Sequence, residues 1–200
     1  MEPLVEIKNL SIRFPEGNST FEAVKGISFS IGKGEIVGVV GESGSGKSMS
    51  ALALMGLLPK DAEIASGSLC FQGEDLVTMK PEKRRQLCGS KMAMVFQEPM
   101  TSLNPVLKIE RQVGESLRIH TKLGNAEIHE RVVQALSEVG LPDPEGLCGK
   151  YPHELSGGMR QRVMIAQAMI NSPSLLIADE PTTALDCVVQ AQILELLRNI

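Results

Sequence analysis

Eight consecutive residues carry the strongest chemical signal in this sequence. They read Gly41-Glu42-Ser43-Gly44-Ser45-Gly46-Lys47-Ser48 and fit the pattern GxxxxGK[ST] at every fixed position. Glycines let backbone N–H groups curl around phosphate oxygens, and a helix that begins there adds its positive dipole end. We expect Lys47 to reach the outer phosphates of a nucleotide and the Ser48 hydroxyl to ligate Mg²⁺. The alternative is a glycine-rich turn that fits the pattern by chance.

A second group of candidate residues follows an apolar run, Leu175-Leu176-Ile177-Ala178, which is typical of a buried strand. A carboxylate at the carboxyl end of such a strand can hold Mg²⁺ through water, and we expect Asp179 in that role. Glu180 follows directly and could accept a hydrogen bond from an attacking water molecule. Alone, this pattern usually marks a solvated strand end. The phosphate-loop motif favours the catalytic interpretation.

A third motif, Leu155-Ser156-Gly157-Gly158-Met159, opens a predicted helix that runs to about Ile170. A helix N-terminus with serine and glycine is a second anion-binding position, in addition to the phosphate loop. One nucleotide rarely needs two such positions from the same subunit. The economical explanation is that Ser156–Gly158 cap the γ-phosphate of ATP bound by a partner subunit, so that ATP joins two copies. The alternative is a helix N-cap followed by a tight glycine packing contact.

Strands and helices must position these motifs. In the first half, residues 4–35 and 61–80 predict short strands separated by turns, because apolar and polar residues alternate. The continuous apolar run Ile36–Val40 predicts a strand buried on both faces of a parallel sheet, directly before the phosphate loop. Ser48–Leu58 is helical by composition, and Pro59 is expected to stop the helix.

In the second half, Met92–Phe96 predicts another apolar strand. Residues 98–150 contain helical pieces between prolines and predict a helical insertion in an α/β sheet. The clearest helix is 126–139, with Asn125 as its cap and Gly140 at its end. Asp186 is expected to cap a final helix.

Composition narrows the class of protein. The chain has 200 residues, enough for one domain, with 42% hydrophobic and 22% charged residues, which is typical of a globular protein. A net charge of −4 argues against a nucleic-acid binder, which needs a basic face. We expect no signal peptide, because acidic residues occur early and no apolar stretch follows the N-terminus, and no apolar run is long enough to span a membrane. The four cysteines form no CxxC motif and are interpreted as small buried residues in a reducing cytosol, although their even number permits disulfides.

Together, the three motifs resemble the nucleotide-binding subunit of an ABC transporter, over about residues 4–198. The resemblance implies an α/β P-loop NTPase fold of the ABC type, with an antiparallel β subdomain and a helical subdomain inserted after the Q-loop. It implies a single ATP-binding domain over residues 1–200, with the helical subdomain at about 98–170. It also implies ATP and Mg²⁺ as ligands, and ATP hydrolysis as the activity.

The resemblance also assigns roles to individual residues. Phe14 occupies the position of an aromatic residue that stacks on adenine, although it could be an ordinary core aromatic. Gln97 resembles the Q-loop glutamine, a catalytic residue that senses Mg²⁺ and the attacking water and links to a membrane subunit; the alternative is a polar loop residue. Asp186, in Thr183-Ala184-Leu185-Asp186, resembles the D-loop aspartate at a dimer interface. The implied Mg²⁺ site consists of Ser48, Gln97 and Asp179.

Longer segments are similar to the dipeptide, oligopeptide and nickel importer ATPases; they are Phe96–Pro105, Tyr151–Arg162 and Ala178–Asp186. This similarity implies a peripheral subunit at the cytoplasmic face of a bacterial inner membrane. Its partners would be two permeases, a second ATPase subunit and, indirectly, a periplasmic binding protein. Peptide is the first expectation for the solute, and nickel, glutathione or another small solute are alternatives.

Two other functional classes fit less well. A soluble ABC ATPase that acts on nucleic acid or ribosomes predicts paired domains or a basic insertion, and a P-loop kinase or GTPase predicts no Leu155–Met159 motif. One departure from the family is notable: no histidine follows Glu180, where the family carries a switch histidine beyond the D-loop helix. The family's last core strands and C-terminal extension are also missing before Ile200, so we expect a fragment or a truncated product.

Overall fold

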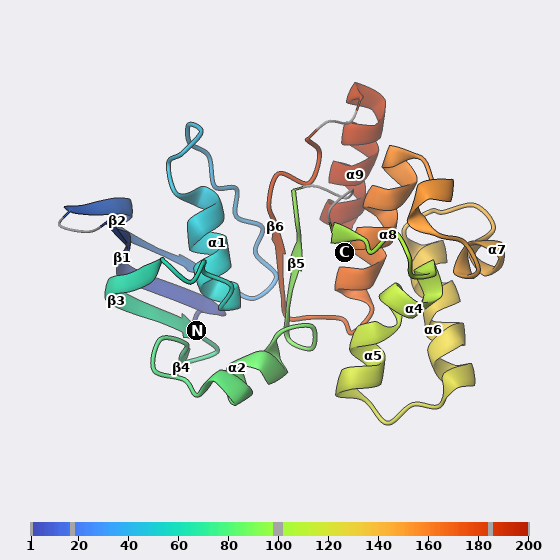
Figure 1. Cartoon of the computed structure of the whole chain (residues 1–200), viewed down its shortest axis with the longest axis horizontal. Coiled ribbons are helices and arrows are strands. Elements are labelled where there is room, and N and C mark those ends of the chain that lie inside the picture. Colours follow the sequence, from blue (N-terminus) through green and yellow to red (C-terminus); the bar gives the residue numbers. More distant parts are fainter. Residues whose placement is uncertain (1, 17–18, 98–101, 184–185, 200) are drawn as a thin grey trace. The chain divides into compact units, whose positions relative to one another are not determined.

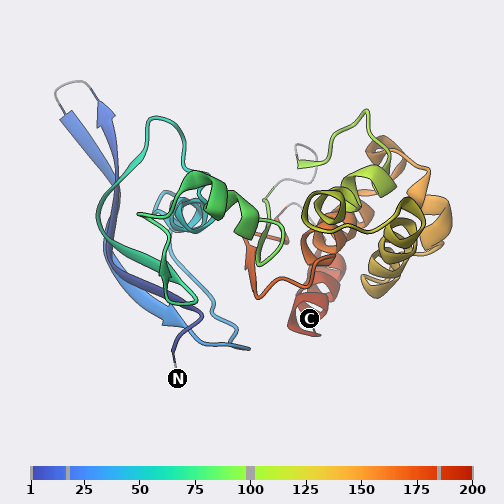
Figure 2. The same cartoon turned by 90° about the horizontal axis from the view of Figure 1, so that it is seen from below.

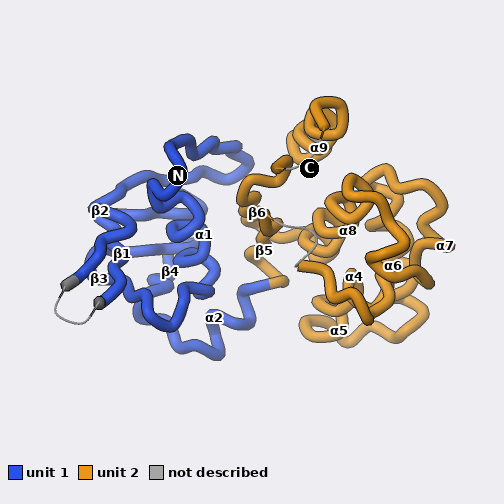
Figure 3. Tube along the Cα trace, turned by 45° about the horizontal axis from the view of Figure 1, so that its top comes forward, with its two compact units in different colours: residues 1–88 blue, residues 89–200 orange. Residues whose placement is uncertain are grey.

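The computed structural model of the chain describes residues 2–16, 19–97, 102–183 and 186–199. The chain folds into two compact units, residues 1–88 and residues 89–200 (Figure 3). The phosphate-loop motif lies in the first unit, and the other two motifs lie in the second. Within the described ranges, no helix combines the length and the apolar character that a membrane span needs.

The first unit is built around an antiparallel sheet (Figure 1). Its strands are β1 (Val5–Glu16), β2 (Ser19–Ile31), β3 (Glu63–Phe71) and β4 (Glu74–Asp75), in the order β2-β1-β3-β4. Val5 pairs with Ile31 on one side and with Phe71 on the other. Alternate apolar side chains of β1 and β3 are buried, and Ile27, Phe29 and Ile31 of β2 are half-buried, as the sequence pattern predicts. The strands predicted within residues 4–35 and 61–80 are confirmed.

The helix α1 (Lys47–Met55) follows the phosphate loop and lies against one face of this sheet, seen end-on in Figure 2. It buries Ala53, Leu54 and Met55. Gly56 ends the helix in the left-handed conformation at φ 72°, and its N–H donates to the carbonyl of Ala53. The prediction that Pro59 ends the helix is therefore wrong, because a left-handed glycine closes the last turn before the proline is reached.

Arg84, in the helix α2 (Pro81–Leu87), also holds the end of α1. Its guanidinium donates to the carbonyls of Ala53 and Leu54, and to that of Leu76 at 3.0 Å. A cation is favourable at a helix C-terminus because the last carbonyls have no partner within the helix.

The strand predicted over Ile36–Val40 does not form, and this prediction is wrong. These residues have no regular secondary structure, and the side chains of Ile36 and Val40 are 77% and 95% exposed. A strand exists only where neighbouring strands complete its hydrogen bonds, and an apolar run cannot supply them by itself. In the first unit the four antiparallel strands pair with one another and not with this segment.

The second unit contains a parallel pair of strands, β5 (Met92–Val95) and β6 (Leu175–Ala178), with Val95 opposite Ala178. All four residues of β5 are buried, but in β6 only Leu175 is. The predicted positions of both strands are confirmed, whereas the full burial predicted for the second is not. Both strands pair with each other, but the helix α8 (Gly157–Met169) contacts β5, which accounts for the greater burial of β5.

Helices make up the rest of the second unit (Figure 1). They are α4 (Ile109–Val113), α5 (Glu115–His120), α6 (Asn125–Glu138), α7 (Pro144–Cys148), the 3₁₀ turn η1 (Pro152–Glu154), α8 (Gly157–Met169) and α9 (Cys187–Asn199). Their apolar faces share one core, which includes Val113, Leu136 and Ile165. The helices predicted within residues 98–150 are present among the described residues, and the clearest of them is confirmed as α6.

Two details of the prediction differ from the structure. The cap of α6 is Gly124 rather than Asn125, and its N–H donates to Glu127 Oε2 at 2.8 Å. Of the four cysteines, all of which are free, only Cys148 is buried, and Cys187 is exposed. The interpretation of the cysteines as buried residues therefore fails for Cys187, because the first position of α9 faces outward.

Candidate functional site

The phosphate-loop motif adopts the backbone that its glycines allow. Gly44 and Gly46 have φ angles of 79° and 88°, in the left-handed region that other residues rarely adopt. Gly46 is also confined by its surroundings, since a Cβ there would lie 2.5 Å from the carbonyl oxygen of Ala23. The carbonyl of Gly46 accepts from Ser50 N–H at 2.9 Å, which begins α1. The predicted loop and helix junction is confirmed, although no strand precedes it.

Lys47 is anchored to this loop. Its Nζ donates to the carbonyls of Gly41 and Glu42, at 2.7 and 2.8 Å. Contact with a phosphate requires Lys47 to exchange these bonds for phosphate oxygens, which are stronger acceptors because they are charged. A left-handed glycine loop, a helix N-terminus and a lysine ammonium together suit the phosphate chain of a nucleotide.

Phe14 lies in the same unit, on β1, and is half-buried. Its ring packs against Phe21 of β2, with the ring centroids 6.4 Å apart and the planes tilted by 39°. Phe14 is not part of the buried core. Stacking of Phe14 on the adenine of a nucleotide stays a prediction.

The second group of residues lies where β5 and β6 end. The parallel register aligns the two carboxyl ends, and Asp179 N–H donates to the carbonyl of Val95 at 3.0 Å. Gln97 Nε2 donates to Glu180 Oε2 at 2.7 Å, although the two residues are 83 positions apart in sequence. The structure thus brings together the two residues predicted to be catalytic.

The contact also fixes the orientation of the Gln97 amide. A carboxylate only accepts hydrogen bonds, so the nitrogen of Gln97 must face Glu180. The amide oxygen of Gln97 can then face a cation, as the predicted role at Mg²⁺ requires. Amide and carboxylate oxygens, such as those of Gln97 and Asp179, are ligand types that suit Mg²⁺.

Thr183, which the resemblance places in the D-loop, also contacts Glu180, and this contact was not predicted from the sequence. Its Oγ1 donates to Glu180 Oε2 at 3.0 Å, and its N–H donates to the carbonyl of Glu180 at 3.1 Å. The signal available in the sequence was weak: a hydroxyl residue lies three positions after a carboxylate, within reach if the chain turns there.

The third motif begins α8. Ser156 is the N-cap, and its Oγ accepts from Met159 N–H at 3.3 Å, while Leu155 is buried beneath it. A Cβ on Gly158 would lie 3.2 Å from Val189 of α9, whereas a Cβ on Gly157 would meet nothing within 4 Å. The alternative interpretation, a cap with a tight glycine contact, therefore accounts for Ser156 and Gly158. It does not account for Gly157.

Asp186 caps α9, as predicted, and its Oδ1 accepts from Val188 N–H and Val189 N–H at 3.1 and 3.0 Å. Val189 is the residue that packs against Gly158, so the start of α9 lies beside the start of α8. The D-loop residues Ala184 and Leu185 lie outside the described residues.

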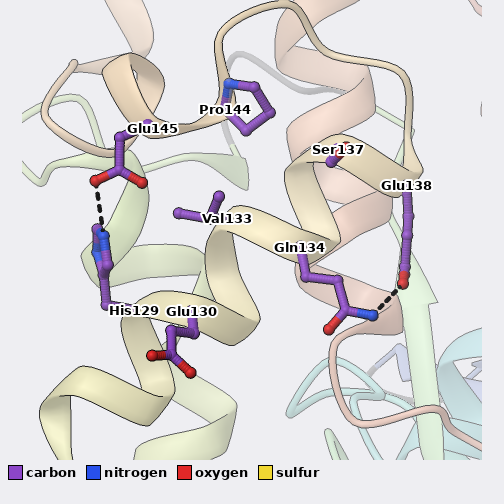
Figure 4. Close-up of a pocket in the computed structure, with 8 residues that line it drawn as sticks. All are labelled: His129, Glu130, Val133, Gln134, Ser137, Glu138, Pro144 and Glu145. Carbon is purple, nitrogen blue, oxygen red and sulfur yellow. Dashed lines mark hydrogen bonds and ion pairs between the residues drawn. The ribbon is translucent and has the colours of Figure 1, made fainter.

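Apart from these motifs, a pocket is lined by residues of α6 and α7, among them His129 and Glu145, which contact each other (Figure 4). His129 Nδ1 lies 2.9 Å from Glu110 Oε1 of α4, and Nε2 lies 2.9 Å from Glu145 Oε1 of α7. Only the imidazolium can donate from both nitrogens. The hydrogen bonds to Glu110 and then to Glu145 raise the pKa of His129 above its ordinary value of 6.5.

The stability of the protein should depend on pH through His129. Because its pKa is raised by folding, the stabilisation is complete below the ordinary histidine pKa of about 6.5 and is lost as the pH rises through the higher folded value. The difference in melting temperature between the wild type and His129→Gln, measured from about pH 6 to about pH 8.5, should shrink as the pH rises. A difference independent of pH would show that the imidazolium contributes nothing.

Comparison with known proteins agrees with this geometry. A model of the family described as "ABC transporter" matches residues 24–183. The dipeptide transport ATP-binding protein DppD of Escherichia coli is 48% identical over 197 residues, which is 98% of this chain and 60% of that protein. The peptidoglycan transport ATP-binding protein YejF of Agrobacterium fabrum is 51% identical over 200 residues, which is 100% of this chain and 37% of that protein.

Among solved structures, the dimeric, post-hydrolysis ATP-binding cassette MJ0796 bound to ADP and Pi has a TM-score of 0.85 at 28% identity, over 96% of this chain and 81% of that one. The expected α/β fold of the ABC type is therefore confirmed. The chain spans 60% or less of the length of the two curated relatives described above. On the family match over most of its length and this structural similarity, the chain belongs to the ABC transporter family.

Proposed function

We propose that this chain is the ATP-binding and ATP-hydrolysing part of a subunit that energises an importer of di- or oligopeptides. The observation that carries the proposal is the similarity to the dipeptide transport proteins, about half of the residues being identical over nearly the whole chain. We also propose that residues 1–200 belong to one ATP-binding domain, with residues of about 98–170 as its helical subdomain.

The nucleotide would bind at the phosphate loop, Gly41–Ser48. The left-handed Gly44 and Gly46 and the N-terminus of α1 support this proposal, because such a backbone points N–H groups at an anion. Lys47 would neutralise the outer phosphates, and Phe14 would stack on the adenine. Mg²⁺, which neutralises charge on the phosphates when bound, would have Ser48, Gln97 and Asp179 as ligands, directly or through water.

Glu180 would accept a hydrogen bond from the attacking water and so orient the water toward the γ-phosphate. Gln97 supports this role because it holds one carboxylate oxygen of Glu180. A carboxylate that is already bound and oriented loses less conformational entropy when the reactants assemble.

Hydrolysis would be linked to pairing of two subunits. The exposed Ser156 and Gly157 at the start of α8 would cap the γ-phosphate held by the partner, with Leu155, Gly158 and Met159 supporting the turn. Asp186, beside this turn, would lie at the interface. The dimeric state of the similar cassette MJ0796 supports this arrangement.

The subunit would bind peripherally at the cytoplasmic face of a bacterial inner membrane. Two integral membrane permeases, a second ATPase subunit and, indirectly, a periplasmic binding protein would complete the transporter. Peptidoglycan transport is a second candidate function, favoured by the 51% identity to YejF. The proposal is tested by isolating the full-length protein from membranes with ATP present. We expect integral membrane proteins to co-purify with it, and recovery with nucleic acid or ribosomes instead would overturn the proposal.

The pairing step should be blocked by Ser156→Asp. Aspartate is as good an N-cap as serine, so α8 should remain stable, but its negative charge would repel the partner's γ-phosphate. We expect the affinity of the monomer for ATP to be unchanged and ATP-driven dimerisation, measured by light scattering, to be at least about tenfold weaker. Ser137→Asp, on an exposed position of α6, is the matched control. Equal dimerisation of both variants would contradict the proposed role of Ser156.

A further inference from the structure

The carboxylate of Glu180 is held by two donors from different segments. Gln97 follows β5 and donates to Oε2 from 2.7 Å, and Thr183 donates to the same oxygen from 3.0 Å. Both bonds converge on Oε2, so the carboxylate is fixed through one oxygen. The other oxygen, Oε1, can face a water molecule.

The backbone around Glu180 is itself constrained. Glu180 has a φ angle of 45°, a left-handed conformation that is uncommon for a residue with a side chain. The turn is closed by Thr183 N–H, which donates to the carbonyl of Glu180 at 3.1 Å. Gln190 of α9 donates to the carbonyl of Thr182 at 3.1 Å and ties this turn to the helix. Such strained backbone is typical of functional sites, where surrounding contacts maintain it.

Thr183 is suited to hold the carboxylate for a second reason. Threonine is β-branched, so its side chain has fewer rotamers than serine and its hydroxyl is better fixed. Glu180 is exposed, and without a partner its long side chain would sample many rotamers. A hydroxyl donor held by its own turn therefore limits where the carboxylate can point.

We propose that Thr183 is a positioning residue for Glu180: its hydroxyl holds Oε2 so that Oε1 can accept a hydrogen bond from the attacking water. This inference rests on the proposed function, since it gives Thr183 a role in the same hydrolysis. Thr183 acts only through Glu180, and it need not contact the nucleotide.

The test compares three variants of the full-length protein in the assembly in which it hydrolyses ATP. Thr183→Val keeps the shape of the side chain and removes the donor, so kcat should fall by about tenfold with KM for ATP unchanged. Thr183→Ser restores the hydroxyl and should recover most of kcat. Thr78→Val is the matched control, because Thr78 Oγ1 makes the same kind of bond, to Asp75 Oδ2 at 3.0 Å, in the other unit.

A double-mutant cycle distinguishes positioning of the Glu180 carboxylate from a general structural effect of Thr183. In a Glu180→Ala background, Thr183→Val should lower the residual rate no further, because the carboxylate that it positions is gone. An equal loss in Thr183→Val and Thr183→Ser, or a loss that persists without the Glu180 carboxylate, would overturn the inference alone. Absence of hydrolysis in the wild-type assembly would overturn the proposed function and, with it, this inference.

Discussion

Replacement of Lys47 by alanine is expected to lower the affinity for ATP by about 100- to 1,000-fold. The reason is that Lys47 is the positive side chain anchored at the phosphate loop, where its Nζ lies 2.7 Å from the carbonyl of Gly41. In the nucleotide complex it would make charge-assisted hydrogen bonds to phosphate oxygens, and alanine can make none. Equilibrium titration with a fluorescent ATP analogue measures the change directly.

Two further variants make the Lys47 result specific. Lys60→Ala removes an exposed lysine beyond the end of α1 and should leave the affinity for ATP unchanged. Lys47→Arg keeps the charge but replaces the ammonium by a planar guanidinium, so it should recover only part of the affinity. Undiminished affinity in Lys47→Ala would mean that this loop does not bind the phosphates.

The second large effect is expected from Glu180→Gln. The amide has nearly the same shape, but it lacks the charged acceptor that would orient the attacking water, so hydrolysis should slow by about 100- to 1,000-fold. ATP binding should persist, because the groups proposed to hold the phosphates are those of the loop Gly41–Ser48, and Glu180 is proposed to act on the water alone. We expect ATP to hold the variant as a stable dimer, measured by gel filtration alongside phosphate release.

Glu195→Gln is the matched control, since Glu195 is an exposed carboxylate on α9. It should hydrolyse ATP at the wild-type rate and should not accumulate as a dimer. If Glu180→Gln also turned over at the wild-type rate, another group would have to orient the water, and the role proposed for Thr183 would lose its basis.

Features decided by neighbouring residues follow from the sequence. Two local predictions, the cap of α6 at Asn125 and the end of α1 at Pro59, missed by one to three residues. The N-cap Asp186 and the glycine that closes α6, Gly140, were predicted where they occur, and Ser156 is the N-cap that the alternative interpretation of its motif named. Each depends on the allowed φ angles of one residue or on a side chain within three residues of the backbone that it binds. Local chemistry of this kind needs no knowledge of the rest of the chain.

Features that need a distant partner were decided only by the tertiary structure. Ile36–Val40 has the composition of a buried strand but finds no neighbouring strand in its unit, and β6 is less buried than its apolar residues suggest. The bond between Gln97 and Glu180 exists because β5 and β6 pair in parallel, a register that neither segment encodes alone. The sequence thus determined which residues can do the chemistry, whereas strand pairing decided which of them meet, because hydrogen-bonded ladders join segments far apart in the chain.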